Sequence, residues 1–166
     1  MKNRHKITIM HVSTNYLPVV GGIELSIKYI SEVLANYGFN NMIVSSIPNK
    51  IRADIKSLEP SCTKIIKVPS VRILYDELTI PLTIPYDALK RANIVLSWTG
   101  SSFFPYLICR EAKKMGKRIV TYMIGVEYLR NHHNTIIRLF GSPYQQSLTR
   151  KWIETSDLIL VTNAFE

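Results

Sequence analysis

The sequence predicts an α/β protein built on one doubly wound parallel sheet, and three observations lead to this class. β-branched apolar runs alternate along the chain with longer segments whose apolar residues recur at helical spacing. The runs are apolar on both faces, which is typical of strands buried between two layers of helices. The 166 residues, 46% of them hydrophobic, suffice for one domain with a substantial core.

The expected strands are short and β-branched. The first, "ITIMHVS", is apolar except at Thr8 and His11. The third ends at Pro69, which has no backbone N–H to donate to a ladder. The ranges are 7–13, 41–46, 64–70, 92–98, 117–125 and 157–163. Because strands and helices alternate over the whole length, right-handed crossovers and a Rossmann-like sheet are expected.

The expected helices begin and end at recognisable residues. The first carries Ile23, Ile27, Ile30 and Leu34 at helical spacing, and Gly38 stands where a left-handed cap would end it. The second begins after a serine cap, has Pro105 in its first turn and stops at Gly116. Residues 131–155 are expected to be helical with a break near 141–143, and the proline-containing segment 71–86 to be a loop or short helical turns.

Composition bounds the partners and the compartment. Lys and Arg exceed Asp and Glu by nine, which favours anionic partners without naming one. Cys62 and Cys109 are too few for a metal motif or a disulfide framework, so a reducing, cytoplasmic setting is expected. The basic start is followed by an apolar run interrupted by polar residues, which matches neither a signal peptide nor a membrane span.

Two adjacent glycines, Gly21 and Gly22, stand where the loop after the first strand enters the first helix. In a doubly wound sheet, ligands bind beyond the carboxyl ends of the strands. Glycines at a helix start allow backbone amides to approach a phosphate closely. A plain tight turn is the alternative, since the pattern is neither GxGxxG nor a P-loop.

The ordered motifs resemble the amino-terminal half of GT-B fold glycosyltransferases, specifically the retaining family 4. The stretch "HVSTNYLPVVGGIELSIKYISEVLANYGFNNMIVSS" carries the likeness at Tyr16, Pro18, Gly21, Gly22, Ile23, Glu24, Gly38 and Phe39. Downstream, "RANIVLSWTGSSFFPYLICREAKKMGKRIVTYMIGVEYL" and "WIETSDLILVTNAFE" are similar to later parts of the same half. The likeness covers nearly the whole chain.

The resemblance implies transfer of a sugar from a nucleotide-sugar to an acceptor, with no cofactor and no metal. The nucleotide-sugar would be a co-substrate held mainly by a second, donor-binding domain. Gly21 and Gly22 would contact its diphosphate, where backbone amides would stabilise the charge of the leaving group. The acceptor, a sugar or a lipid-linked sugar, would contact Asn15, Tyr16, Gly125 and Glu127. Glu127 is equally well explained as a solvated loop charge.

Two departures from the family pattern limit the reading. The donor-domain signature of two Glu separated by seven residues is absent before Glu166, so the chain is expected to be a single acceptor-side domain, inactive without its donor domain. Met123 and Ile124 stand where many relatives have a histidine, so no catalytic residue is assigned. A free-standing subunit that pairs with a separate donor chain, or a generic nucleotide-binding Rossmann domain, is the alternative.

A cluster of basic residues on the second long helix and its exit is a candidate membrane contact. It comprises Arg110, Lys113, Lys114, Lys117 and Arg118, with Glu111 as the one nearby carboxylate. A solvated helix face is the usual explanation for such charges. Neighbouring aromatics, Trp98, Phe103, Phe104 and Tyr106, suggest instead a contact with the cytoplasmic face of an anionic membrane. Nucleic acid is not an expected partner.

The histidines are poor metal ligands. His11 lies within the first strand, where a core histidine bonded to backbone is more probable than a ligand. His132 and His133 are adjacent on an expected helix and therefore point in different directions. No zinc site is expected.

Overall fold

A computed structural model describes residues 6–17, 21–47, 63–73, 78–98, 102–124, 133 and 135–161. Along these ranges the chain alternates strands with helices. The elements are β1 (Thr8–Ser13), α1 (Gly22–Asn36), β2 (Asn40–Ser46), β3 (Thr63–Val68), β4 (Ser70–Arg72), β5 (Thr79–Pro81), α2 (Tyr86–Arg91), β6 (Ile94–Ser97), α3 (Phe103–Lys114), β7 (Arg118–Met123), α4 (Thr135–Thr155) and β8 (Leu158–Val161). All six predicted strands are confirmed, with ends shifted by at most two residues.

The main sheet has six parallel strands in the order β3-β2-β1-β6-β7-β8. The order runs outward in one direction from β1 and in the other from β6, so the first and fourth strands of this sheet are neighbours. This is the strand order of the doubly wound Rossmann fold, and the point of reversal lies between β1 and β6. The predicted fold class is confirmed.

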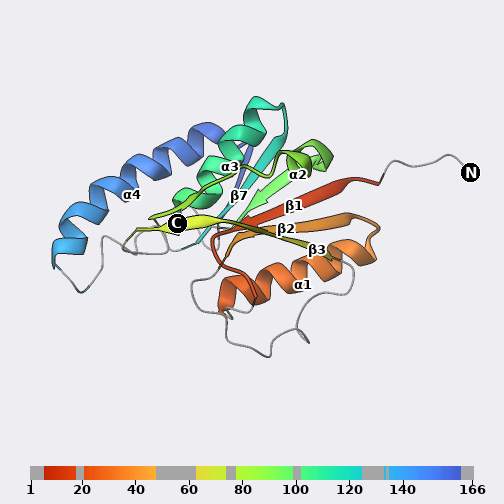
Figure 1. Ribbon diagram of the computed structural model, residues 1–166, viewed down its shortest axis with the longest axis horizontal. Coiled ribbons are helices and arrows are strands. Elements are labelled where there is room, and N and C mark those ends of the chain that lie inside the picture. The colour runs from red at the N-terminus through yellow and green to blue at the C-terminus, as the bar shows by residue number, and fades with distance from the viewer. Residues whose placement is uncertain are drawn as a thin grey trace, which may run out of the picture.

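Helices cover both faces of the sheet. Figure 1 shows α1 on one side and α2, α3 and α4 on the other. Because side chains alternate along each strand, Met10 and Val12 of β1 face the α2–α4 side, while His11 faces α1. The α2–α4 side holds the larger cluster, centred on Phe104, Ile108 and Trp152. Tyr16, Leu17, Ile27, Ile43 and Trp98 fill the α1 side.

The predicted glycine caps are confirmed. Gly38 follows α1 with φ of 89°, and Gly116 follows α3 with φ of 72°. Both values lie in the left-handed region, where a side chain would strain the backbone. The amides of Gly38 and Phe39 bond back to Ala35 O and Leu34 O, so the last carbonyl groups of α1 are satisfied.

The segment 71–86, for which the sequence predicts a loop or short helical turns, contains regular structure among its described residues. β4 and β5 form a separate antiparallel ribbon in which Ser70 is opposite Pro81 and Arg72 is opposite Thr79. Pro81 is tolerated because it ends its strand. α2 begins at Tyr86, directly after Pro85 in the N-cap position. The prolines therefore mark element boundaries here and do not exclude elements.

The predicted break near Gly141 and Pro143 is wrong, because α4 runs unbroken through Pro143. A proline inside a helix removes one hydrogen bond and crowds the preceding turn. The helix nevertheless continues into a stretch anchored by Gln145, Leu148 and Trp152, which are buried at spacings of three and four. The packing of this stripe outweighs the local preference of Pro143 to end the helix.

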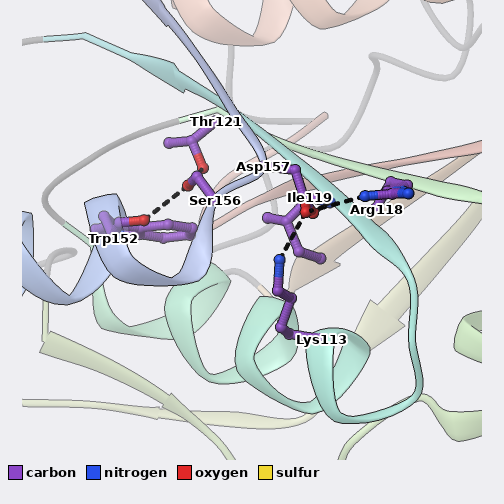
Figure 2. A network of polar contacts seen from close by, with 7 residues as sticks. All are labelled: Lys113, Arg118, Ile119, Thr121, Trp152, Ser156 and Asp157. Carbon is purple, nitrogen blue, oxygen red and sulfur yellow. Dashed lines mark hydrogen bonds and ion pairs between the residues drawn. The ribbon is translucent and has the colours of Figure 1, made fainter.

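A polar junction joins α3, α4, β7 and β8 (Figure 2). Asp157 accepts hydrogen bonds from Lys113 Nζ at 2.8 Å and from the Ile119 amide at 2.8 Å, and Arg118 lies at 3.5 Å. These donors, Lys113 first, hold the pKa of Asp157 below its ordinary value. Ser156 bonds to Thr121 Oγ1 and to the Trp152 carbonyl at 2.7 Å each. The junction fixes the start of β8 against β7.

Replacing Asp157 should destabilise the fold. We expect Asp157→Ala to lower the free energy of unfolding by about 1–2 kcal/mol, because the Ile119 amide loses its acceptor. Asp157→Asn keeps an acceptor oxygen and should cost less, since the exposed ion pairs contribute little. Urea unfolding of the two variants measures the difference. Equal losses would show that charge, and not the amide bond, stabilises the junction.

Candidate functional site

The candidate site lies at the carboxyl edge of the sheet, where β1 and β6 end side by side. Strand order reverses between these two strands, and in open α/β sheets ligands bind in the crevice beside such a reversal. The loop after β1 carries Asn15, Tyr16 and, at the start of α1, Gly21 and Gly22. The fold therefore places four of the predicted site residues at the edge where ligands bind.

A buried hydrogen-bond chain begins at this edge and runs beneath α1 toward the amino end of β2. Trp98, the residue after β6, donates its indole N–H to His11 Nδ1 at 3.2 Å. His11 Nε2 lies 3.0 Å from Asn41 Oδ1, and Asn41 Nδ2 donates to the Ser31 carbonyl of α1 at 3.0 Å. Since Nδ1 accepts from Trp98, Nε2 carries the proton and the imidazole is neutral. One chain thus joins β6, β1, β2 and α1.

His11 is a core histidine, as the sequence predicts, but its partners are side chains and not backbone groups. It has no exposed surface, and burial lowers its pKa to about 4 against the smaller opposing effect of the Asn41 hydrogen bond. The Trp98 ring stacks near the imidazole and meets Tyr122 edge-on at 5.4 Å. His11 is therefore a structural group at neutral pH.

The two glycines differ in what surrounds them. Gly21 is the N-cap residue of α1 in an extended conformation, and a methyl group added to it would lie 2.7 Å from Glu24 Oε2. Glu24 is buried and places its carboxylate beside the helix start, where negative charge is favourable. Gly22 has no atom within 4 Å of an added methyl group and no positive φ. The described structure gives no steric reason for glycine at 22.

Two cations from outside the loop hold its first half. Lys67 of β3 donates from Nζ to the carbonyl oxygens of Leu17 at 2.7 Å and Tyr16 at 3.3 Å, and to Ser45 Oγ at 2.9 Å. Its ammonium lies 5.7 Å from the centre of the Tyr16 ring. Arg72 of β4 donates to Asn15 Oδ1 at 3.1 Å. The loop is therefore tied to β3 and β4 as well as to β1.

Lys67 and Arg72 are absent from the residues that the sequence singles out. A signal exists for Lys67, because it is a cation within the apolar strand "KIIKV" and shares a face with Ile65. Its distance in sequence from Leu17 hides the contact. Arg72 carries no comparable local signal.

The structure describes two of the four predicted acceptor residues, Asn15 and Tyr16. Asn15 is partly exposed and bonds to Arg72, whereas the Tyr16 side chain packs in the α1-side core with 1% of its surface exposed. A ligand would therefore meet Asn15 more readily than the Tyr16 ring. Gly125 and Glu127 lie outside the described residues. The acceptor roles of all four stay predictions.

The basic residues of α3 and its exit interact with carboxylates. Arg110 and Lys114 pair with Glu111, whose pKa they hold below its ordinary value, Lys114 foremost. Lys113 and Arg118 share Asp157, and Lys117 donates to the Lys90 carbonyl. A second carboxylate, distant in sequence, thus joins the cluster. The membrane contact of these five residues stays a prediction.

The aromatic residues near α3 do not lie on an exposed surface, so the prediction that they contact a membrane is wrong. Trp98, Phe104 and Tyr106 are buried, at 1%, 0% and 8% of their surface, and Phe103 is partly buried against the core. They face the sheet because they fall on the inward side of α3 and of the β6 end. Within the described ranges, no helix is long and apolar enough to cross a bilayer.

Other reactive groups are inert or scattered. Cys109 is a free thiol that is fully buried, and burial raises its pKa far above the ordinary value, against a smaller opposing effect of a hydrogen bond to Ser97. Among the residues that the structure describes, no group of three or more His, Cys, Asp or Glu side chains could hold a metal ion.

No protein-family model matches the sequence, and no curated protein matches it. Several solved structures are similar to the chain at low sequence identity. A protein assigned as a UDP-N-acetylglucosamine 2-epimerase from Listeria monocytogenes superimposes with a TM-score of 0.50 at 12% identity, covering 93% of this chain and 38% of that chain. A microbiome-derived acarbose kinase gives 0.48 at 11% identity over 95% of this chain and 70% of that chain. A Staphylococcus aureus homoserine dehydrogenase gives 0.44 at 12% identity over 94% and 32%.

Together, topology and comparison define the class: the chain folds as a Rossmann-like α/β domain like those of GT-B-type proteins. At 12% identity the likeness to the epimerase concerns the fold alone. The chain spans 38% of that protein's length.

Acid should destabilise the protein through His11. Its folded pKa, about 4, is below the ordinary 6.5, so the unfolded chain binds a proton that the folded chain rejects. Stability from the neutral imidazole is complete above pH 6.5 and falls as pH drops toward 4. We expect a loss of about 2 kcal/mol between pH 7.5 and pH 5. In urea titrations at the two pH values, His11→Gln should lose much less free energy of unfolding than the original chain. An equal loss in both proteins would show that other groups cause the pH dependence.

Removing the Lys67 ammonium should loosen the loop after β1. We expect Lys67→Met to lower the free energy of unfolding by about 1–2 kcal/mol, because two carbonyl groups lose a charged donor. Amide exchange in residues 14–17 should also become faster. Lys64→Met is the matched control, since Lys64 is an exposed lysine on the same strand. Equal effects of both substitutions would contradict the anchoring role.

Proposed function

We propose that this chain is the acceptor-side domain of a retaining GT-B glycosyltransferase of family 4. Joined to a donor-binding domain, it transfers a sugar from a nucleotide-sugar to a sugar or lipid-linked acceptor, without a metal or other cofactor. The position of the Gly21–Gly22 turn carries the proposal: it opens the helix that follows β1, at the reversal of strand order. The ordered motifs around Tyr16 and Glu24 support the family.

In this proposal the helix start serves the leaving diphosphate. The first amides of α1 lack partners within the helix and, with the helix dipole, favour negative charge. Interactions that strengthen as charge develops on the departing diphosphate lower the barrier to transfer. Gly22 fits this role best, because its missing side chain is explained neither by backbone strain nor by a neighbouring atom. The open space above it would admit a phosphate oxygen.

Charge balance at this turn involves Glu24. Its carboxylate lies beside Gly21, so a diphosphate that approaches the same amides meets a negative charge. Binding therefore requires Glu24 to turn away or cations to compensate it. The chain's excess of nine positive charges favours such a ligand at long range, and the donor domain would supply the closer cations.

The acceptor would lie along the β1 loop. Asn15 offers a partly exposed amide whose oxygen Arg72 already orients. Such an amide both donates to and accepts from sugar hydroxyls. Gly125 and Glu127, which lie outside the described residues, are proposed as further acceptor contacts.

Gly22→Ala separates function from folding. Alanine at the first helical position should leave the free energy of unfolding within about 1 kcal/mol of the original. In the chain joined to the donor-binding domain that its genome encodes, we expect sugar transfer to fall at least tenfold, because the methyl group blocks the phosphate. Val33→Ala, at an exposed position of α1 three turns further along, is the control and should retain activity. Full activity of Gly22→Ala would contradict the proposed phosphate contact.

Titration of the chain alone with nucleoside diphosphates distinguishes the proposal from a generic nucleotide-binding domain. We expect weak binding or none in a calorimeter, since the donor domain holds most of the nucleotide. Micromolar binding by the 166 residues would contradict an acceptor-side role. A separately encoded donor chain, in place of a fused one, would establish the subunit alternative.

A further inference from the structure

The beginning of α4 exposes large apolar side chains. Leu139 and Phe140 have 67% and 71% of their surface exposed, and the neighbouring Thr135 and Arg138 are exposed as well. Figure 1 shows this end of α4 at the periphery of the molecule, while its other end lies beside α3. Exposed apolar residues that cluster at one place call for an explanation that scattered ones do not.

These side chains are not a frayed continuation of the core. α4 packs inward through Gln145, Leu148 and Trp152, which are buried. Continued toward the helix start at the same spacing, that stripe passes through Gly141 and Arg138. Leu139 and Phe140 lie off the stripe, so closer packing of α4 on α3 would not cover them.

The surrounding sequence is basic and free of acid. From Tyr128 to Ile153 there is no Asp or Glu, whereas Arg130, Arg138, Arg150 and Lys151 are positive. On α3, by contrast, every basic residue discussed above has a carboxylate or a carbonyl group as partner. The start of α4 therefore combines exposed apolar groups with positive charge that has no acidic neighbour in sequence.

We propose that the beginning of α4 docks on an anionic phospholipid surface. Leu139 and Phe140 enter the boundary between headgroups and acyl chains, and Lys151, which is exposed three turns further along the same side of α4, binds headgroup phosphates. A protein partner fits less well, since the two side chains expose on the order of 250 Å², against the roughly 800 Å² per partner of a stable protein interface. A bilayer needs no such area, because apolar insertion and electrostatic attraction add.

This surface differs from the α3 cluster that the sequence suggests, and it does not depend on sugar transfer. The aromatics near α3 are buried, whereas Phe140 is available. Within the proposed function, a membrane contact at α4 would bring the domain to lipid-linked acceptors. A membrane contact without transferase activity, or activity without the contact, would leave the other proposal intact.

Co-sedimentation of the full chain with lipid vesicles tests the surface. The probes are vesicles of phosphatidylcholine and phosphatidylglycerol in equal parts, and vesicles of phosphatidylcholine alone. We expect salt-sensitive binding to the anionic vesicles that becomes at least tenfold weaker in Leu139→Ser/Phe140→Ser. Ile153→Ser is the matched control, because Ile153 is exposed at the other end of α4. It should bind like the original chain.

Four results would overturn the proposal. They are no binding to anionic vesicles, equal binding by the double variant, equal loss in the Ile153 control, and loss on neutralising Lys113 and Lys114 with none on changing Leu139 and Phe140. Sedimentation velocity measures whether the chain forms dimers through this surface. If the original chain dimerises and the double variant is monomeric, a second copy covers this surface instead of lipid. Circular dichroism and unfolding of each variant confirm that the fold is intact.

Discussion

The hydrogen-bond chain from Trp98 through His11 and Asn41 to Ser31 is the constraint on which the packing of α1 against the sheet depends. It crosses the point where strand order reverses and ends on α1. Each member is buried, so each donor must meet its acceptor, and the imidazole is restricted to one tautomer. The chain sets the position of α1 on the sheet and therefore where its glycine-rich start lies.

The loop after β1 is held by hydrogen bonds from two charged side chains, Lys67 and Arg72. Lys67 donates hydrogen bonds to carbonyl and hydroxyl oxygens, and its ammonium lies over the Tyr16 ring. Glu24 lies at the other end of the loop, at the start of α1. A cation and an anion thus lie at the two ends of this loop, and the field of both acts on any charged ligand that approaches it.

Local patterns predicted the strands and the glycine caps, because burial between two layers and a positive φ each leave a mark on a few adjacent residues. Contacts between distant residues left no such mark. Lys67 meets Leu17 across some fifty positions, and Asp157 meets Lys113 across 44. The prediction at Pro143 failed for a related reason. The helix continues because Leu148 and Trp152 pack against the core, and that packing is less evident in the sequence than a single proline. At the site, sequence order located the glycine turn, while the partners of Asn15 and His11 required the fold.

The two tryptophans lie in separate layers of the molecule. Trp98 packs on the α1 side, against His11 and Tyr122 at the end of β6, whereas Trp152 packs against Tyr106 between α3 and α4 on the opposite face. Each indole is fully surrounded by protein. The chain therefore carries two indole fluorophores, one beside the candidate site and one remote from it. Their emission distinguishes an event at the crevice from a general loosening of the structure.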